Sequence, residues 1–186
     1  MASVLGIPRK ATYRDLQSWP DDGRRYELHD GEVVVVPAPF PRHQIAMLEL
    51  TDHLRSYVQP HGGIVLVSPI DIVFNDTNVL QPDIVVFTAV RRHHVRLDEA
   101  IRVAPDVCVE VLSSGTAGHD RGRKLRMFER FGVQEYWIVD PVAERVEVRA
   151  LRQDQYELTL SAGRGDELRS VALPEFTCAA ETIFPW

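Results

Sequence analysis

The sequence predicts an α/β protein in which a central mixed β-sheet is flanked by α-helices. Residues 84–87, 107–112 and 136–139 are short and almost wholly apolar, which is typical of strands covered on both faces. Residues 43–58 carry apolar side chains at helical spacing, and a second helical pattern, 120–131, lies between the last two of these strands. This order of strands and helices predicts helices packed against a sheet.

Shorter signals complete the expected element order. Thr12 is a plausible N-cap for a short helix over 12–18, with Asp15 three residues later. An Asp-Gly turn at Asp30 predicts a hairpin, and alternation along 145–149 predicts a strand with one exposed face. The further strands are expected at 25–28, 32–36, 64–67, 70–74, 144–150 and 156–160, with a turn at 75–78 and an apolar C-terminal segment, 171–186, docked on the body.

Length and composition indicate an ordinary globular chain. The 186 residues fit one domain spanning 1–186, with 45% hydrophobic and 26% charged residues. The cysteines, Cys108 and Cys178, match neither a disulfide scaffold nor a zinc site. The N-terminus does not resemble a signal peptide, and no apolar run approaches the roughly 20 residues that span a bilayer. We therefore expect a cytoplasmic protein without a membrane partner.

The charge distribution gives mixed signals about nucleic acid. A net charge of −6 argues mildly against tight nonspecific binding to a polyanion. Two basic clusters stand out locally, Arg91, Arg92, His93, His94 and Arg96, and then Arg121, Arg123, Lys124 and Arg126. A solvated loop and a solvated helix face explain the two clusters equally simply.

Two acids stand where burial is expected. Asp83 directly precedes the apolar strand 84–87, and Glu110 interrupts the apolar segment VCVEVL. A buried carboxylate is costly unless it is paired, and a structural salt bridge is the simplest explanation for any one of them. If the two strands are neighbours, however, both carboxylates can share a hard cation such as Mg²⁺.

Lys124 is the expected basic partner of these acids. It shares a helix face with Phe128 and Phe131, so it projects from the buried side, toward Glu110. Of the 21 cationic residues, only Lys10 and Lys124 are lysines. Lysine and arginine are not equivalent, because lysine is a compact charge with a tunable pKa. Chance placement is the alternative explanation.

The motif Pro82-Asp83, then Val109-Glu110-Val111-Leu112, then Lys124 resembles the PD-(D/E)XK nuclease superfamily. More closely, the chain resembles the bacterial restriction-endonuclease family called Uma-two. The matching segments, 26–34, 41–50, 80–87 and 107–141, cover most of residues 10–150. The resemblance implies a restriction-endonuclease-like fold with the acids near the centre of the sheet.

The resemblance also implies a metal-dependent phosphodiesterase site. Asp83 and Glu110 would hold Mg²⁺ (or Mn²⁺), the carbonyl of Val111 would add a ligand, and Lys124 would stand beside the attacking water or the phosphate. The general superfamily motif has lysine two residues after the glutamate, where this chain has Leu112. The Uma-two pattern places its lysine on the following helix, which corresponds to Lys124.

Three further residues are weaker candidates, of which Glu27 and His43 match positions of the family. Glu27, in the N-terminal hairpin, is a candidate acid on the metal side, with a salt bridge to Arg24 or Arg25 as the alternative. His43 is a minor candidate, since a histidine at the start of a helix more often caps or packs than binds a ligand. Gln81 is a minor candidate that lies beside Asp83 in the sequence.

The expected substrate is double-stranded DNA. Arg121, Arg123 and Arg126 would contact flanking phosphates without reading sequence. Cutting both strands needs two sites, which favours a homodimer. The alternatives are a non-catalytic dimeric interaction module that retains the nuclease fold, favoured by the net charge and the lack of a DNA-reading domain, and an RNA or junction nuclease with the same site.

Overall fold

The computed structural model describes residues 10–113, 118 and 120–186. The expectation that the chain begins without a signal peptide concerns residues 1–9, which lie outside the described residues. In the described part, no helix combines the length and the apolar character needed to cross a membrane.

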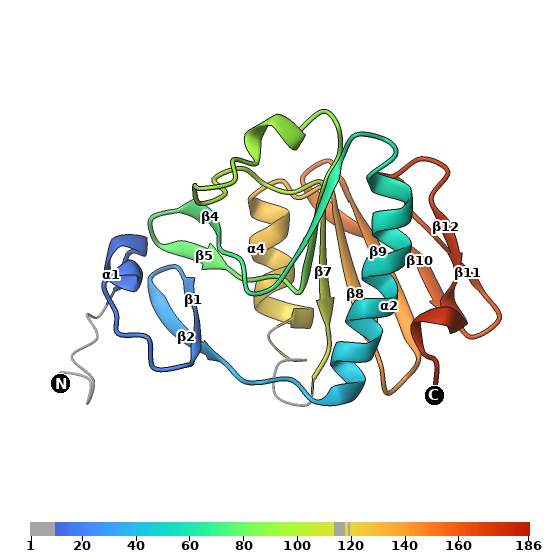
Figure 1. The fold of residues 1–186 in the computed structure, drawn as a ribbon, viewed down its shortest axis with the longest axis horizontal. Helices are drawn as coiled ribbons and strands as arrows, with labels where there is room; N and C mark the ends of the chain where they lie inside the picture. Colours follow the sequence, from blue (N-terminus) through green and yellow to red (C-terminus); the bar gives the residue numbers. More distant parts are fainter. Residues whose placement is uncertain (1–9, 114–117, 119) are drawn as a thin grey trace.

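A six-stranded mixed sheet forms the centre of the protein, as the sequence predicts (Figure 1). Its strand order is β10-β9-β8-β7-β6-β3, and only β7 and β8 run parallel to each other. The strands are β3 (Ile64–Val67), β6 (Ile84–Phe87), β7 (Val107–Val111), β8 (Glu135–Asp140), β9 (Arg145–Arg152) and β10 (Gln155–Gly163). The predicted pairing of the last two strands is confirmed.

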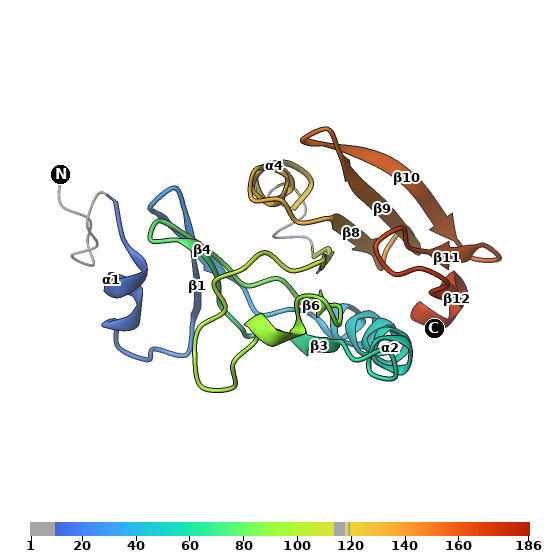
Figure 2. The ribbon, with the colours of Figure 1, turned by 90° about the horizontal axis from the view of Figure 1, so that it is seen from above.

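Helices cover the two faces of this sheet (Figure 2). Leu50 and Leu54 of α2 (Pro41–Val58) pack in one core cluster with Val109. Phe128 of α4 (Leu125–Arg130) packs in another with Cys108. Because side chains alternate along a strand, neighbouring residues of β7 enter opposite cores. This explains why the central strands are almost wholly apolar, with Glu110 the exception in β7.

A second, four-stranded antiparallel sheet lies beside the first, in the order β2-β1-β5-β4 (Figure 1). Its strands are β1 (Arg25–His29), β2 (Glu32–Val36), β4 (Ile72–Asn75) and β5 (Asn78–Leu80), and α1 (Tyr13–Gln17) adjoins it. The predicted hairpin is confirmed, and so is the Thr12 cap with its capping box to Asp15. The predicted turn over 75–78 is confirmed, since it joins β4 to β5 with Asn75 paired to Asn78, but β5 itself was not predicted. A three-residue strand is too short to show a period.

The helix expected over 120–131 has a different first turn. Residues Asp120–Lys124 form a π-helical turn that continues into α4. Asp120 is therefore buried inside the wide turn rather than being an N-cap. Single π turns are rare and occur often at functional sites. The π turn carries Lys124 at its end.

The C-terminal segment docks on the body, as predicted. It forms β11 (Glu167–Arg169), β12 (Thr177–Ala179) and the 3₁₀ helix η3 (Ala180–Ile183). Ile183 and Phe184 are fully buried in the core cluster that contains α2. Another 3₁₀ helix, η1 (Arg92–His94), lies in the connection between β6 and β7.

Candidate active site

The pairing of β6 with β7 brings Asp83 and Glu110 to one end of the sheet. Ile84 of β6 lies opposite Val109 of β7 in antiparallel register. Asp83, just before β6, therefore lies beside the carboxyl end of β7, where its Oδ2 accepts the N–H of Val111 at 2.8 Å. Asp83, Glu110 and Val111 line one small cavity of about 20 Å³. A space of this size holds roughly one water molecule.

Lys124 enters this site from the π turn. Its Nζ lies 2.8 Å from Glu110 Oε1 and 2.9 Å from Glu27 Oε1. A third carboxylate, that of Asp120, lies 3.8 Å away. The predicted approach of Lys124 to Glu110 is thus present, and the side chain is only 7% exposed. We call Glu27, Asp83, Glu110, Asp120 and Lys124 the Lys124 cluster.

Glu27 reaches the cluster from the second sheet. Its Oε2 lies 2.9 Å from His29 Nε2, and its Oε1 accepts the N–H of Gln81 at 2.8 Å. The alternative of a salt bridge to Arg24 or Arg25 is wrong. Arg24 pairs instead with Asp22 at 3.7 Å. Glu27, Leu28 and His29 are all buried, so both faces of this end of β1 are covered and Glu27 is buried on one of them.

His43 and Gln81 line the same cavity. The Nε2 of His43 lies 3.1 Å from Asp83 Oδ2, so His43 helps to fix that carboxylate. The side-chain amide of Gln81 donates to Asp71 at 2.8 Å. Among the described residues, His43 Nδ1 and Gln81 Oε1 are buried without a hydrogen-bond partner. Such atoms are ready to bind a water.

Burial and mutual charge interactions shift the pKa values of residues in the Lys124 cluster. Burial first, and then repulsion from neighbouring carboxylates, raises the pKa of Glu110 well above its usual range, although the Lys124 ammonium opposes the rise. Burial opposes the charge on Lys124, but attraction to the carboxylates outweighs it and raises the pKa of Lys124. Burial also opposes ionisation of Glu27, yet Lys124 and then His29 lower its pKa to about 2. Three carboxylates, those of Glu27, Glu110 and Asp120, thus surround one lysine, and Asp83 lies beside them on His43. Carboxylates outnumber the lysine, which favours a bound cation.

The three arginines expected to contact phosphates are placed differently from one another. Arg121 forms an ion pair with Glu147, and Arg123 forms one with Glu32 at 2.7 Å. Arg126 is exposed and donates to the carbonyl of Gly122 in its own turn. Arg126 therefore has the most accessible charge of the three.

The other basic segment, 91–96, is also engaged in ion pairs. Arg91 lies 3.1 Å from Asp106, and Arg96 lies 3.1 Å from Glu99. Because the pairs neutralise part of the segment, its local charge is smaller than the sequence indicates.

The family relationship follows from comparison with known proteins. The family Uma2, described as "Putative restriction endonuclease", matches residues 12–181. The chain belongs to the Uma2 family. No curated protein matches it. A crystal structure of a protein from Anabaena variabilis, described as "a putative nuclease", superposes with a TM-score of 0.76 at 22% identity, covering 94% of this chain and 98% of that one.

The Uma2 relationship and the site geometry together support a nuclease. The resemblance that led to Asp83, Glu110 and Lys124 is confirmed at the level of the family, and the restriction-endonuclease-like fold is confirmed by the structural likeness. Two residues of the site were not predicted, Asp120 and His29. Asp120 had a detectable signal, since it stands four residues before Lys124 and such pairs lie on one helix face.

Divalent cations are general in this class of fold, and the residues present fit one. Among the described residues, no three His, Cys, Asp or Glu side chains are arranged to hold a metal as they stand. Mg²⁺, however, keeps several waters and is usually bound through one or two carboxylates. Asp83 and Glu110 supply two, and the Val111 carbonyl points to the same strand edge as its N–H. The donor set is all oxygen, which suits Mg²⁺ or Mn²⁺.

Proposed function

We propose that this protein is a Mg²⁺-dependent endonuclease that hydrolyses phosphodiester bonds in DNA. The observation that carries the proposal is the Lys124 cluster, in which acids from two sheets and one helical turn converge on a buried lysine. A cluster assembled only for stability has little reason to bury more carboxylates than cations, because each uncompensated charge is costly. Perturbed pKa values and a cavity at the same place are typical of active sites.

In the proposed site, Asp83 and Glu110 hold the cation, together with the carbonyl of Val111. The bound cation would act as a Lewis acid and lower the pKa of its water. The Val111 N–H and His43 hold Asp83 in place, and Lys124 keeps a positive charge at Nζ for the phosphate oxygens or the attacking water. Glu27 shares Lys124 and so helps to position its ammonium.

The wider proposal is a homodimer acting on double-stranded DNA in the cytoplasm, with residues 1–186 forming one domain. Two sites related by a two-fold axis would cut both strands. Arg126, with Arg121 and Arg123 after release from their partners, would contact flanking phosphates.

The first test is calorimetric titration of Mg²⁺ and Mn²⁺ into the wild type and into the Asp83→Ala, Glu110→Ala double variant. We expect saturable binding that the double variant loses. The matched control is Asp98→Ala, Glu99→Ala, which removes the same charge from exposed positions and should bind like the wild type.

Cleavage is measured in parallel on supercoiled plasmid and on RNA. Lys124→Ala should bind Mg²⁺ but cleave neither substrate efficiently, and a linear product without a nicked intermediate would support the dimer. A wild type that neither binds the cations nor cleaves any nucleic acid would contradict the proposal and favour the non-catalytic interaction module.

A further inference from the structure

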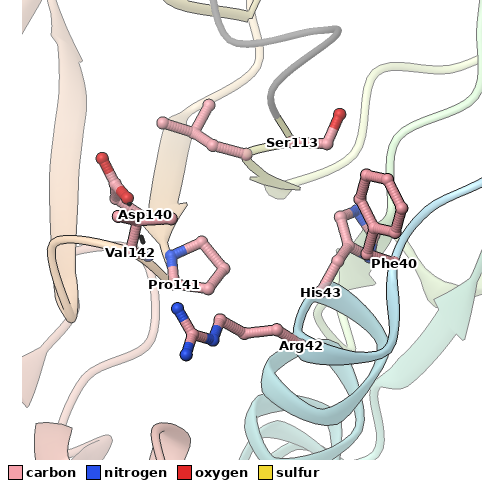
Figure 3. Close-up of a pocket in the computed structure, with 8 residues that line it drawn as sticks. Phe40, Arg42, His43, Ser113, Asp140, Pro141 and Val142 are labelled. Atoms are coloured by element: carbon pink, nitrogen blue, oxygen red, sulfur yellow. Dashed lines mark hydrogen bonds between the residues drawn. The ribbon is translucent and has the colours of Figure 1, made fainter.

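A larger cavity adjoins the Lys124 cluster (Figure 3). Its volume is about 460 Å³, within the range of small-molecule pockets. Its lining comes from the start of α2, the end of β7 and the turn after β8, namely Phe40, Arg42, His43, Leu112, Asp140 and Pro141, with Ser113 and Val142. His43 and Ser113 also line the small cavity of the cluster, so the two cavities are neighbours.

The lining is mainly apolar and carries an exposed aromatic ring. Phe40 is 69% exposed, although a phenyl ring is normally buried, and Val142 is 81% exposed. Figure 3 shows Phe40 and Pro141 on opposite sides of the space. A flat apolar group placed between them would cover both surfaces. Exposed apolar surface next to a candidate site indicates a ligand rather than a folding requirement.

The charges around the cavity determine which part of a ligand can enter it. Arg42 is exposed and stacks over the ring of Trp186 at 5.0 Å, and among the described residues it has no carboxylate within ion-pairing distance. Asp140 contributes a carboxylate to the lining, whose negative charge would repel a phosphate. Its Oδ1 accepts the N–H groups of Val142 and Ala143, and its Oδ2 lies 3.5 Å from Arg121, so it is held in place by the protein. A phosphate therefore fits near Arg42 at the rim, and a base fits inside.

We propose that this cavity binds one unstacked nucleobase of the substrate strand, adjacent to the phosphate held at the Lys124 cluster. This inference rests on the proposed nuclease function and narrows its substrate. Aromatic stacking platforms bind bases of single strands without strong sequence preference. A base in a duplex must first leave its stack, which has a cost. The protein would thus bind single-stranded or locally unpaired DNA more tightly than a perfect duplex, and a double-stranded substrate would have to open at the site of cleavage.

The test is fluorescence anisotropy with a labelled 12-nucleotide DNA strand of mixed sequence, alone or paired with its complement, in Ca²⁺ buffer. We expect the wild type to bind the single strand more tightly than the duplex. Phe40→Ala should weaken single-strand binding about tenfold, as expected for loss of one stacked base. Phe40→Trp should restore it. Leu97→Ala, which truncates an exposed residue outside the cavity, is the matched control.

Mg²⁺-dependent cleavage of the same strands is measured alongside and separates the two proposals. Suppose that the wild type cleaves, and that the wild type and Phe40→Ala bind the single strand with equal affinity. This result would overturn the base pocket and leave the nuclease proposal standing. Equal weakening of single strand and duplex by Phe40→Ala would also overturn it. Absence of both binding and cleavage would overturn both proposals.

Discussion

The two ends of β7 both bury acidic side chains, but in different ways. At the amino end, Glu135 of the neighbouring strand accepts four hydrogen bonds, from the backbone of Val171 and Ala172, the hydroxyl of Ser170 and the indole of Trp137. At the carboxyl end, three acids of the Lys124 cluster, Glu27, Glu110 and Asp120, lie around one ammonium.

Asp106, also at the amino end, is satisfied in the same manner as Glu135. It accepts from the backbone and hydroxyl of Thr88 and pairs with Arg91. Buried polar groups are normally compensated in this way. The comparison teaches that burial of an acid alone does not identify a site. What distinguishes the Lys124 cluster is that its carboxylates compete for one cation beside a cavity.

The largest expected difference concerns activity. Glu110→Gln should lower nucleic-acid cleavage about 10³-fold, the scale of losing one preorganised electrostatic group. Glu135→Gln, a matched change on the next strand, should leave the cleavage rate of the folded protein unchanged. Initial rates on plasmid DNA, corrected for the folded fraction, measure both. Similar losses of cleavage rate in the two variants would show that the acids at the two ends of β7 do not differ in function.

For the free energy of unfolding, we expect the opposite: the change at Glu135 should have a larger effect than the change at Glu110. Glu135→Ala leaves four buried hydrogen-bond donors without an acceptor. We therefore expect it to lower the free energy of unfolding by about 3 kcal/mol or more. Urea titration followed by tryptophan fluorescence measures the loss. Glu110→Gln serves as the reference, because it keeps its shape and an acceptor for Lys124. If Glu135→Ala unfolds no more easily than that reference, Glu135 is not a structural acid.

Mg²⁺ should stabilise the folded protein only by binding the acids at the carboxyl end of β7. Mg²⁺ at 100 times its dissociation constant should raise the free energy of unfolding by about 2.7 kcal/mol in the wild type. The gain should persist in Glu135→Gln and disappear in Asp83→Asn. Unfolding with and without Mg²⁺ gives the comparison directly, and an equal gain in Asp83→Asn would place the cation elsewhere.

The smallest effect is the dependence of stability on pH. Because burial and neighbouring acids raise the pKa of Glu110, its ionised form is disfavoured in the folded state. The contribution of Glu110 to stability is therefore most favourable below the unfolded pKa of about 4.3 and is lost as the pH rises toward the folded value. Glu110→Gln should be more stable than the wild type at pH 7, with a smaller difference at pH 4. Urea midpoints at the two pH values test this, and a constant difference would contradict it.

Much of the fold was predictable because its signals are local. The apolar strands 84–87 and 107–111 and the periodicity of α2 each lie within a few residues of sequence. The capping box at Thr12 is equally local. The four-stranded sheet was not predicted as a separate unit, since β5 is short and pairs with Leu28, which is distant in sequence. The π turn at Asp120 was hidden because its composition does not differ from that of an α-helix.

The sequence by itself determined which residues could do chemistry, namely Asp83 and Glu110 in apolar surroundings and Lys124 on a buried helix face. Only the tertiary structure decided that Glu27 joins them, that Arg121 and Arg123 are paired within the chain, and that Phe40 stands beside the site. The physical reason is how far apart in the sequence the interacting residues lie. Burial and periodicity are properties of neighbouring residues, whereas ion pairs and cavities depend on which distant segments the sheets bring together.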